Sequence, residues 1–280
     1  MKNLGYYNGR VGLIEEMSIP MNDRACFFGD GIYDATYCRH YHIYALDAHV
    51  ERFFNSAALM RMTPPLTREE LKTLLCELVR RVDDDEQFVY FQLTRGTAPR
   101  NHAFPGADVP ANLWVTLTPR KVKDTYKHLR LISREDTRFL HCNVKTINLL
   151  PSVMAAQAAE EAGVDETVLH RGERVTECAH SNINMIQNGV FVTPPADNLI
   201  LPGIGRANLL AMCKKLGFAA EERPFTMVEL MAADEVIVSS SGCFCMAVDE
   251  IDGKPVGGRA PVMLKALQDA LVRDWLEKTE

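Results

Sequence analysis

The sequence predicts an α+β fold with two domains. Short strand patterns, hairpin turns and separate helices follow one another without the regular strand–helix alternation of a doubly wound parallel sheet. No Gly-x-Gly-x-x-Gly turn leads from a strand into a helix, which argues against a dinucleotide-binding fold. The length of 280 residues suits one large or two medium domains. We therefore expect a small N-terminal domain over 1–119, a polar and basic linker, and a larger C-terminal domain over 125–280.

The N-terminal domain opens with a hairpin signal. Asn8-Gly9 lies between two strand-like pairs of residues, and this dipeptide favours the positive φ angles of a tight turn. The range 39–46 predicts a strand, after which we expect Asp47 to cap a helix. The rest of the domain is expected to contain a helix opened by the capping box 67–70 and strands over 88–95 and 113–118.

The C-terminal domain alternates more often between strand and helix patterns. Pro151 marks the start of a helix that Gly163 ends, in keeping with the preference for proline at helix starts and glycine at helix ends. Asn188-Gly189 and Asp252-Gly253 each predict a hairpin. The other expected elements are strands over 128–133, 166–170, 182–187, 190–193 and 236–239, helices over 204–216 and 261–276, and a capping box at 226–229.

The composition is that of an ordinary soluble globular protein, with 47% hydrophobic and 24% charged residues and a formal net charge of -6. No apolar run reaches the roughly 18 residues that span a membrane, and the first residues lack the apolar core of a signal peptide. No basic patch with interleaved aromatic residues is present, so we expect neither nucleic acid nor a membrane as partner. The eight cysteines form no Cys-x-x-Cys pair, which favours reduced thiols in a cytoplasmic protein and no metal site.

A lysine within an apolar run is the most informative candidate for chemistry. Lys145 lies in the stretch 142–150 between apolar residues, just before the helix that begins at Pro151. Lysine is costly to bury, and burial favours a neutral amine that can form a Schiff base with an aldehyde. Pyridoxal 5′-phosphate (PLP) is the commonest aldehyde cofactor. By itself the pattern also fits a lysine that reaches solvent.

Other patterns would complement such a cofactor. The glycine-rich turn 201–206 runs directly into a helix, whose N-terminus offers unpaired N–H groups and a positive dipole end to a phosphate. Ser240 and Ser241 follow a buried strand and could supply hydroxyl donors, and Arg52 could add a positive charge. Glu177, at the end of a short strand, could keep a pyridine nitrogen protonated. An ordinary loop-to-helix junction and a surface glutamate are the alternative interpretations.

These motifs, taken in order, resemble the class IV (fold type IV) PLP-dependent aminotransferases. The resemblance covers nearly the whole chain and rests on the segments 28–34, 46–52, 142–150, 175–177, 181–182 and 201–206. It implies the fold type IV architecture, in which the cofactor lies where the two domains meet. It also implies a homodimer with active sites at the interface between subunits.

Within this family the chain looks most like the D-amino acid aminotransferases, because of the segment 94–105. In that group the residues that match Arg100 and His102 reach into the site of the partner subunit. Together with the tyrosine that matches Tyr33, they hold the substrate α-carboxylate. The chemistry is suitable, because arginine offers a planar fork that fits a carboxylate. Without the resemblance, this segment would be interpreted as an exposed polar loop.

The resemblance also implies roles around the cofactor. Lys145 matches the Schiff-base lysine, which also moves a proton, and Glu177 matches the residue at the pyridine nitrogen. Arg138 matches an arginine near the phenolic side of the cofactor. The implied reaction moves the amino group of a D-amino acid to PLP and then to a 2-oxo acid such as 2-oxoglutarate. The residues that match the phosphate-binding cup are Arg52, Ile204, Gly205, Ser240 and Ser241.

The chain departs from the D-amino acid aminotransferase pattern at several positions. Gly205 and the neighbourhood of Gly242 replace threonines, Cys178 replaces a glycine, and 244–246 replaces a more polar segment. These changes affect the cofactor cup and the substrate side but not the expected catalytic residues.

Three alternative functions stay open. Two belong to the same fold: 4-amino-4-deoxychorismate lyase and branched-chain L-amino acid aminotransferase. The pair Arg100 and His102 argues against both. The third is a PLP-binding protein without turnover, against which Lys145 and Glu177 argue.

Overall fold

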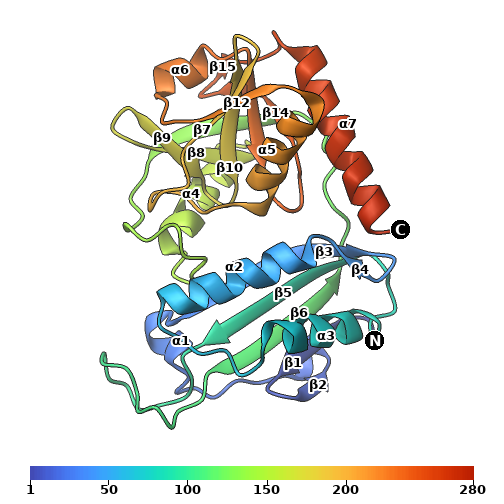
Figure 1. Ribbon diagram of the computed structural model, residues 1–280. Coiled ribbons are helices and arrows are strands. Elements are labelled where there is room, and N and C mark those ends of the chain that lie inside the picture. Colours follow the sequence, from blue (N-terminus) through green and yellow to red (C-terminus); the bar gives the residue numbers. More distant parts are fainter. The chain divides into compact units, whose positions relative to one another are not determined.

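The computed structural model describes all residues from 1 to 280, and they divide into two compact units (Figure 1). The chain leaves unit 1 after Val122, within the region expected to be the linker. The short segment around Lys145 is grouped with unit 1, although it lies within the range 125–280 that was expected for the C-terminal domain. Unit 1 comprises Met1–Val122, Val144–Asn148 and Glu277–Glu280, and unit 2 comprises Lys123–Asn143 and Leu149–Leu276.

Unit 1 is built on a six-stranded antiparallel sheet, shown in blue to green in Figure 1. Its elements are β1 (Leu4–Tyr7), β2 (Arg10–Gly12), η1 (Ile14–Glu16), α1 (Arg24–Phe28), β3 (Gly31–Arg39), β4 (His42–Ile43), α2 (Leu46–Leu59), α3 (Arg68–Val79), β5 (Gln87–Thr94) and β6 (Asn112–Pro119). The strand order is β2-β1-β6-β5-β3-β4. The core joins α2 and α3 to the sheet through buried side chains such as Phe53, Leu75 and Phe91.

Unit 2 contains a nine-stranded mixed sheet. Its elements are β7 (Leu129–Glu135), α4 (Leu150–Glu161), β8 (Glu166–Arg171), β9 (Arg174–Cys178), β10 (Asn182–Gln187), β11 (Val190–Thr193), α5 (Ile204–Leu216), β12 (Ala219–Glu222), α6 (Met227–Met231), β13 (Glu235–Ser239), β14 (Met246–Ile251), β15 (Lys254–Pro255) and α7 (Pro261–Lys278), whose last two residues are grouped with unit 1. The order is β12-β11-β10-β13-β14-β7-β8-β9, with β15 beside β14, and β7 runs parallel to both of its neighbours. None of the helices in either unit is both long and apolar enough to cross a membrane.

The turns and capping boxes predicted from the sequence are confirmed. Asn8-Gly9 joins β1 to β2, Asn188-Gly189 joins β10 to β11, and Asp252-Gly253 joins β14 to β15. All six residues have positive φ angles, as such turns require. The capping boxes at Thr67 and Thr226 begin α3 and α6.

The strand predicted over 39–46 is wrong. β3 runs from Gly31 to Arg39, and it is followed by His40 and Tyr41 with φ angles of 50° and 62°. Two consecutive residues in the left-handed region reverse the chain, which then pairs with β3 as the two-residue strand β4.

Asp47 does not cap α2 as expected. The helix begins at Leu46 after Ala45, whose φ angle is 51°, and no side chain caps its first turn. Asp47 lies inside that turn, and its carboxylate pairs with Lys72 of α3. The acid still lies near the positive end of the helix dipole, where a negative charge is favourable.

Candidate active site

Lys145 is attached to the open edge of β3. Strand β4 pairs with only the last two residues of β3, so the first half of this edge needs other partners. The segment Val144–Asn148 supplies them. The carbonyl oxygen of Lys145 accepts from the Tyr33 N–H at 2.9 Å, and the Ile147 N–H donates to the Gly31 carbonyl at 3.1 Å. Backbone pairing therefore fixes the lysine beside the start of β3.

The side chain of Lys145 lies against Tyr33. Its Nζ is 4.4 Å from the centroid of the tyrosine ring, within the range in which the ring face attracts a cation. Tyr33 stacks in turn on Tyr90, with centroids 5.3 Å apart and rings inclined by 22°. Burial raises the pKa of Tyr90, whose hydroxyl donates to Gln92 at 2.5 Å. The structure thus brings two predicted site residues together, and Tyr90 packs against the same tyrosine.

Arg52, expected in the phosphate cup, is bound to a buried acid. Its Nε and Nη2 donate to the two carboxylate oxygens of Asp34 at 2.8 and 2.7 Å. The Nδ1 of His49 is also 2.7 Å from Asp34, and the side chains of Asp34 and His49 are fully buried. Asp34 and His49 were not predicted to support Arg52. The available signals were the acid in the segment 28–34 and the three-residue spacing that places His49 and Arg52 on one face of α2.

Arg100 and His102 lie on the loop between β5 and β6, and both are exposed. The guanidinium of Arg100 is 5.3 Å from the ring centroid of Phe28, at the end of α1. The His102 ring lies 5.1 Å from the same centroid. Two of the three residues that were predicted to bind a carboxylate therefore lie against the same aromatic side chain.

In unit 2, Glu177 is a buried carboxylate surrounded by donors, with only 5% of its surface exposed. Its Oε2 accepts from the Asn182 side-chain amide at 2.9 Å and from the Leu201 N–H at 3.1 Å. Its Oε1 accepts from the guanidinium of Arg138. The surface alternative for this glutamate is therefore wrong.

Arg138 is shared between Glu177 and Asp136. Its Nε and Nη2 each donate to Asp136 at 2.9 Å, and Asp136 also accepts from the Thr176 hydroxyl at 2.9 Å. Burial lowers the pKa of Arg138, but the hydrogen bond to Asp136 and the charge of Glu177 outweigh it and leave the pKa raised. Asp136 was not predicted as part of the site, because an acid in a polar stretch gives no signal of its own. The position of Arg138 near a cofactor's phenolic side stays a prediction.

Helix α5 begins close to the turn that carries Ser240. A Cβ added at Gly205 would lie 2.9 Å from the carbonyl carbon and oxygen of Ser240, so only glycine permits this approach without a shift. The N-cap is Gly203, which has no side chain to cap the helix. The first N–H groups of a helix lack partners within it. Together with the half-buried Ser240 and Ser241, the start of α5 at Ile204 can therefore receive an anion.

The predicted site residues thus form local groups within each unit. Unit 1 joins Lys145 to Tyr33 and holds Arg52 on α2. Unit 2 joins Glu177 to Arg138 and sets the start of α5 beside Ser240. An amine beside a phenol can move protons, while the buried carboxylate and the anion site can hold a charged cofactor.

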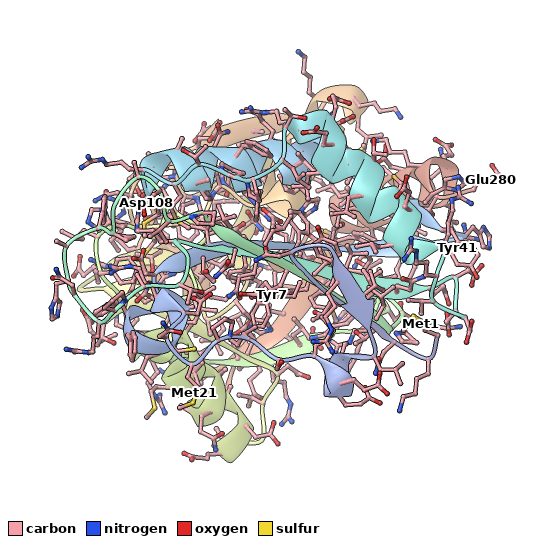
Figure 2. All side chains as sticks on the ribbon, turned by 90° about the horizontal axis from the view of Figure 1, so that it is seen from below. Met1, Tyr7, Met21, Tyr41, Asp108 and Glu280 are labelled. Atoms are coloured by element: carbon pink, nitrogen blue, oxygen red, sulfur yellow. The ribbon has the colours of Figure 1, made fainter.

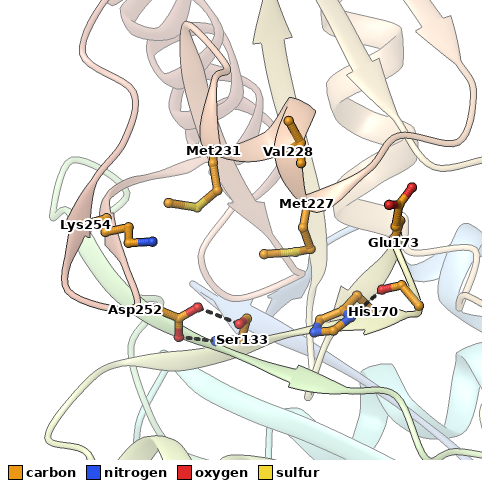
Figure 3. Close-up of a pocket in the computed structure, with 9 residues that line it drawn as sticks. Ser133, His170, Glu173, Met227, Val228, Met231, Asp252 and Lys254 are labelled. Atoms are coloured by element: carbon orange, nitrogen blue, oxygen red, sulfur yellow. Dashed lines mark hydrogen bonds between the residues drawn. The ribbon is translucent and has the colours of Figure 1, made fainter.

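A pocket of about 330 Å³ lies elsewhere in unit 2 (Figure 3). Met227 and Met231 of α6 line one side, and His170 and Asp252 lie across from them. Asp252 accepts hydrogen bonds from the N–H and hydroxyl of Ser133, as Figure 3 shows. No predicted site residue lines this pocket, so it is distinct from the candidate site.

Comparison with protein families identifies one that covers most of the chain. The model of the family "amino-transferase class IV" matches residues 31–251. The D-alanine aminotransferase of Listeria monocytogenes serotype 4b is 38% identical over 261 residues, which cover 91% of this chain and 90% of that protein. The D-alanine aminotransferase of Bacillus licheniformis is 35% identical and covers 98% of this chain and 97% of its own.

Solved structures show the same fold over nearly the whole chain. The branched-chain aminotransferase of Thermoproteus uzoniensis, with norvaline, has a TM-score of 0.88 at 25% identity and covers 99% of this chain and 96% of its own. A branched-chain amino acid aminotransferase of T.th., solved with pyridoxamine 5′-phosphate, has a TM-score of 0.87 at 26% identity and covers 97% of this chain and 93% of its own. The predicted α+β, fold type IV architecture is therefore confirmed.

Proposed function

The chain belongs to the class IV aminotransferases, and on this premise we propose that it moves the amino group of a D-amino acid to a 2-oxo acid with PLP as cofactor. The observation that carries the proposal is the position of Lys145, fixed by backbone pairing with its amine at the face of Tyr33. The relatives at 35–38% identity are named D-alanine aminotransferases, which favours D-alanine as donor. We propose 2-oxoglutarate as the acceptor, as the resemblance to the family implies.

We propose that the residues predicted for the phosphate-binding cup hold the cofactor phosphate. The backbone N–H groups at Ile204 and Gly205, with Ser240 and Ser241, would bind its phosphate, and Arg52 would add a positive charge. The fit is supported by the close approach of Gly205 to the Ser240 turn and by the donor character of this helix start. Bound PLP would supply an electron sink for the reaction.

Glu177 and Lys145 would perform the remaining tasks. Glu177 would face the pyridine nitrogen, with its orientation set by Arg138, Asn182 and the Leu201 N–H. Lys145 would bind the cofactor covalently and move the proton at the substrate Cα. Since Tyr33 lies against the amine, it would limit where this side chain can reach.

We propose that Arg100, His102 and Tyr33 bind the substrate α-carboxylate, with the loop acting in the site of a partner subunit. This role requires a homodimer. Helix α4 supports dimer formation, because Leu150, Val153 and Met154 expose 58–72% of their surface. Analytical ultracentrifugation should therefore report twice the mass of one chain, and a monomer at micromolar concentration would contradict this part of the proposal.

We place the enzyme in the cytoplasm. All eight cysteines are free thiols, and six of them are buried. Proteins of oxidising compartments commonly use cysteines as disulfides, whereas reduced thiols are usual in the cytoplasm. Fractionation of the native host would test this placement, and recovery of the enzyme outside the cytoplasm would contradict it.

One comparison of substrates tests the reaction. The wild-type enzyme should transfer the amino group to 2-oxoglutarate faster from D-alanine than from L-leucine, and it should not release pyruvate from 4-amino-4-deoxychorismate. Faster transfer from L-leucine would favour a branched-chain aminotransferase, and pyruvate from aminodeoxychorismate would favour the lyase. Bound PLP without any turnover would favour the non-catalytic alternative.

Arg100→Ala should reduce kcat/KM for D-alanine and D-glutamate alike, whatever the side chain. Loss of a charged hydrogen-bond partner typically costs about 1.5–3 kcal/mol, or roughly tenfold to over a hundredfold. PLP should stay bound, since Arg100 is not among the residues proposed for the phosphate. Near wild-type kcat/KM in both Arg100→Ala and His102→Ala would show that the loop does not bind the carboxylate.

Gly205→Ala should weaken PLP binding and lower the melting temperature. The new Cβ would meet the Ser240 backbone, which cannot move aside as a flexible side chain can. Overpacking of this kind typically costs about 1–3 kcal/mol. Ala207→Ser, at an exposed position of the same turn, is the matched control and should change neither quantity. An unchanged PLP dissociation constant in Gly205→Ala would exclude the start of α5 from the cofactor site.

A further inference from the structure

The loop that carries Arg100 and His102 is exposed along most of its length. It joins β5 to β6, and Asp108 marks its far part in Figure 2. An exposed loop of this length has many conformations unless its backbone is held. A site that binds the substrate carboxylate is stronger when its hydrogen-bond donors are already ordered, because ordering them during binding costs affinity.

The two ends of the loop are held together by a close backbone approach and by side-chain hydrogen bonds. Gly96 has a φ angle of 108°, and a Cβ there would lie 2.2 Å from the carbonyl oxygen of Pro110. The buried carboxylate of Asp23 accepts from the Thr94 hydroxyl at 2.8 Å and from the Asn112 amide at 2.7 Å. These bonds tie the end of β5 to the start of β6. They leave the part around Arg100 to be held by other groups.

That part is held by Arg24, a side chain that is only 3% exposed. Its Nη1 donates to the carbonyl oxygens of Asn101 at 2.6 Å and of Ala103 at 3.2 Å. These two carbonyls flank His102, and Asn101 directly follows Arg100. A buried guanidinium is costly to leave without partners. The hydrogen bonds from Arg24 to the loop carbonyls therefore stabilise this conformation of the loop backbone.

The direction of Arg24 is set by Asp30. The Nε of Arg24 donates to Asp30 Oδ2 at 2.7 Å, and Arg95 donates to the same carboxylate at 2.9 Å. The guanidinium of Arg95 then lies 3.7 Å from the ring centroid of Phe104, which is two residues beyond His102. One buried acid therefore orients two arginines, of which one holds the loop carbonyls and the other holds a loop aromatic ring.

We propose that Arg24 is a positioning residue for substrate binding: it fixes the backbone on both sides of His102 so that Arg100 and His102 meet the α-carboxylate in a pre-ordered arrangement. This inference rests on the proposed function, since it assumes that the loop binds substrate. The ligand class is the carboxylate of an amino acid or a 2-oxo acid. Arg24 contacts the loop backbone and Asp30, and it acts through the loop.

Arg24→Met is the decisive variant, because methionine keeps much of the apolar stem and removes the donors. The first readout is cleavage by trypsin after the exposed Arg100, followed by mass spectrometry of the fragment that begins at Asn101. The second is KM and kcat for D-alanine in enzyme saturated with PLP. Arg68→Met is the matched control: Arg68 also pairs with an acid, Glu51, and lies over a phenylalanine, Phe54, but on the exposed surface of α3.

Cleavage at Arg100 should become at least about tenfold faster in Arg24→Met, since the lost bonds come from a charged donor. KM for D-alanine should rise by about tenfold or more, while kcat changes little and the visible absorbance of bound PLP is unchanged. Arg68→Met should match the wild type in all these quantities. If Arg24→Met fails to fold, Arg24→Lys keeps a charge for Asp30 but lacks the fork that also reaches the carbonyls. It should shift both readouts in the same direction.

Two results would overturn the inference. Cleavage at Arg100 at the wild-type rate would show that Arg24 does not hold the loop. Faster cleavage with an unchanged KM would show that loop order does not matter for substrate binding. The proteolysis comparison needs no substrate, so it judges the anchoring even if wild-type enzyme fails to use D-alanine, which would count against the proposed function instead.

Discussion

Lys145→Ala should abolish amino transfer from D-alanine while leaving the fold intact. A positioned acid–base group alone contributes about a hundredfold to ten-thousandfold to a rate, and Lys145 is also the proposed covalent attachment point for PLP. The side chain is half-buried and makes no ion pair that the fold depends on, so the circular dichroism spectrum and the melting temperature of the apo form should match the wild type. Transfer to 2-oxoglutarate, measured in a coupled assay, gives the loss.

Two controls make this prediction specific. Lys121→Ala removes an exposed lysine of unit 1 that pairs with Glu86, and it should retain full activity. Borohydride treatment of the wild type should fix PLP to a peptide that contains Lys145. A labelled peptide centred on another lysine, or measurable D-alanine turnover by Lys145→Ala, would refute the assignment.

Lys145 could be identified from the sequence, but the contacts that fix its position could not. A lysine in an apolar run is unusual enough to be noticed in the sequence. Its place beside Tyr33 depends on pairing with the edge of β3, and that pairing joins segments more than 100 residues apart. Strand β3 was not predicted because its buried face carries Asp34 and Thr36 among the apolar residues. These polar side chains interrupt the alternation that identifies a strand.

Local signals were the reliable part of the sequence. Asn-Gly and Asp-Gly turns and capping boxes are formed by residues within a few positions of one another, so each could be identified without the fold. The networks around the site are different. Arg24 and Asn101 are 77 positions apart, and Arg138 and Glu177 are 39 apart. No periodicity links such residues, and only the folded chain shows which acid pairs with which arginine.

Asp34→Asn should lower the free energy of unfolding by about 3–5 kcal/mol, because the substitution leaves the guanidinium of Arg52 buried without its counter-charge. Asp34 is fully buried and Arg52 only 8% exposed, so water cannot replace the lost partner. Asp47→Asn, also in unit 1, is the matched control. Asp47 pairs with Lys72, but its side chain is 88% exposed, so the cost should stay below about 1 kcal/mol. Urea unfolding at pH 7 measures both, and equal losses would contradict the prediction.

The difference between wild type and Asp34→Asn should also depend on pH in a defined way. Burial acts to raise the pKa of Asp34, but Arg52 and His49 outweigh it and leave this pKa well below its usual range. A carboxyl whose pKa is lowered by folding contributes its stability above the unfolded value of about 3.9 and loses it as the pH falls further. The difference should therefore persist down to about pH 4 and shrink below it.

The ionisation of His49 affects the free energy of unfolding at a higher pH than that of Asp34. Burial lowers its pKa despite the opposing influence of Asp34, so the unfolded chain takes up a proton before the folded one does. Both proteins should therefore lose stability as the pH falls below about 6.5, where an unfolded histidine titrates. Asp34→Asn should lose at least as much as the wild type, because it lacks the carboxylate that acts to raise the pKa of His49. Urea unfolding at pH 7, 5.5, 4.5 and 3.5 separates the two steps. If the difference between the proteins already disappears between pH 7 and 5.5, Asp34 takes up its proton in that range, and its pKa in the folded protein is not lowered as predicted.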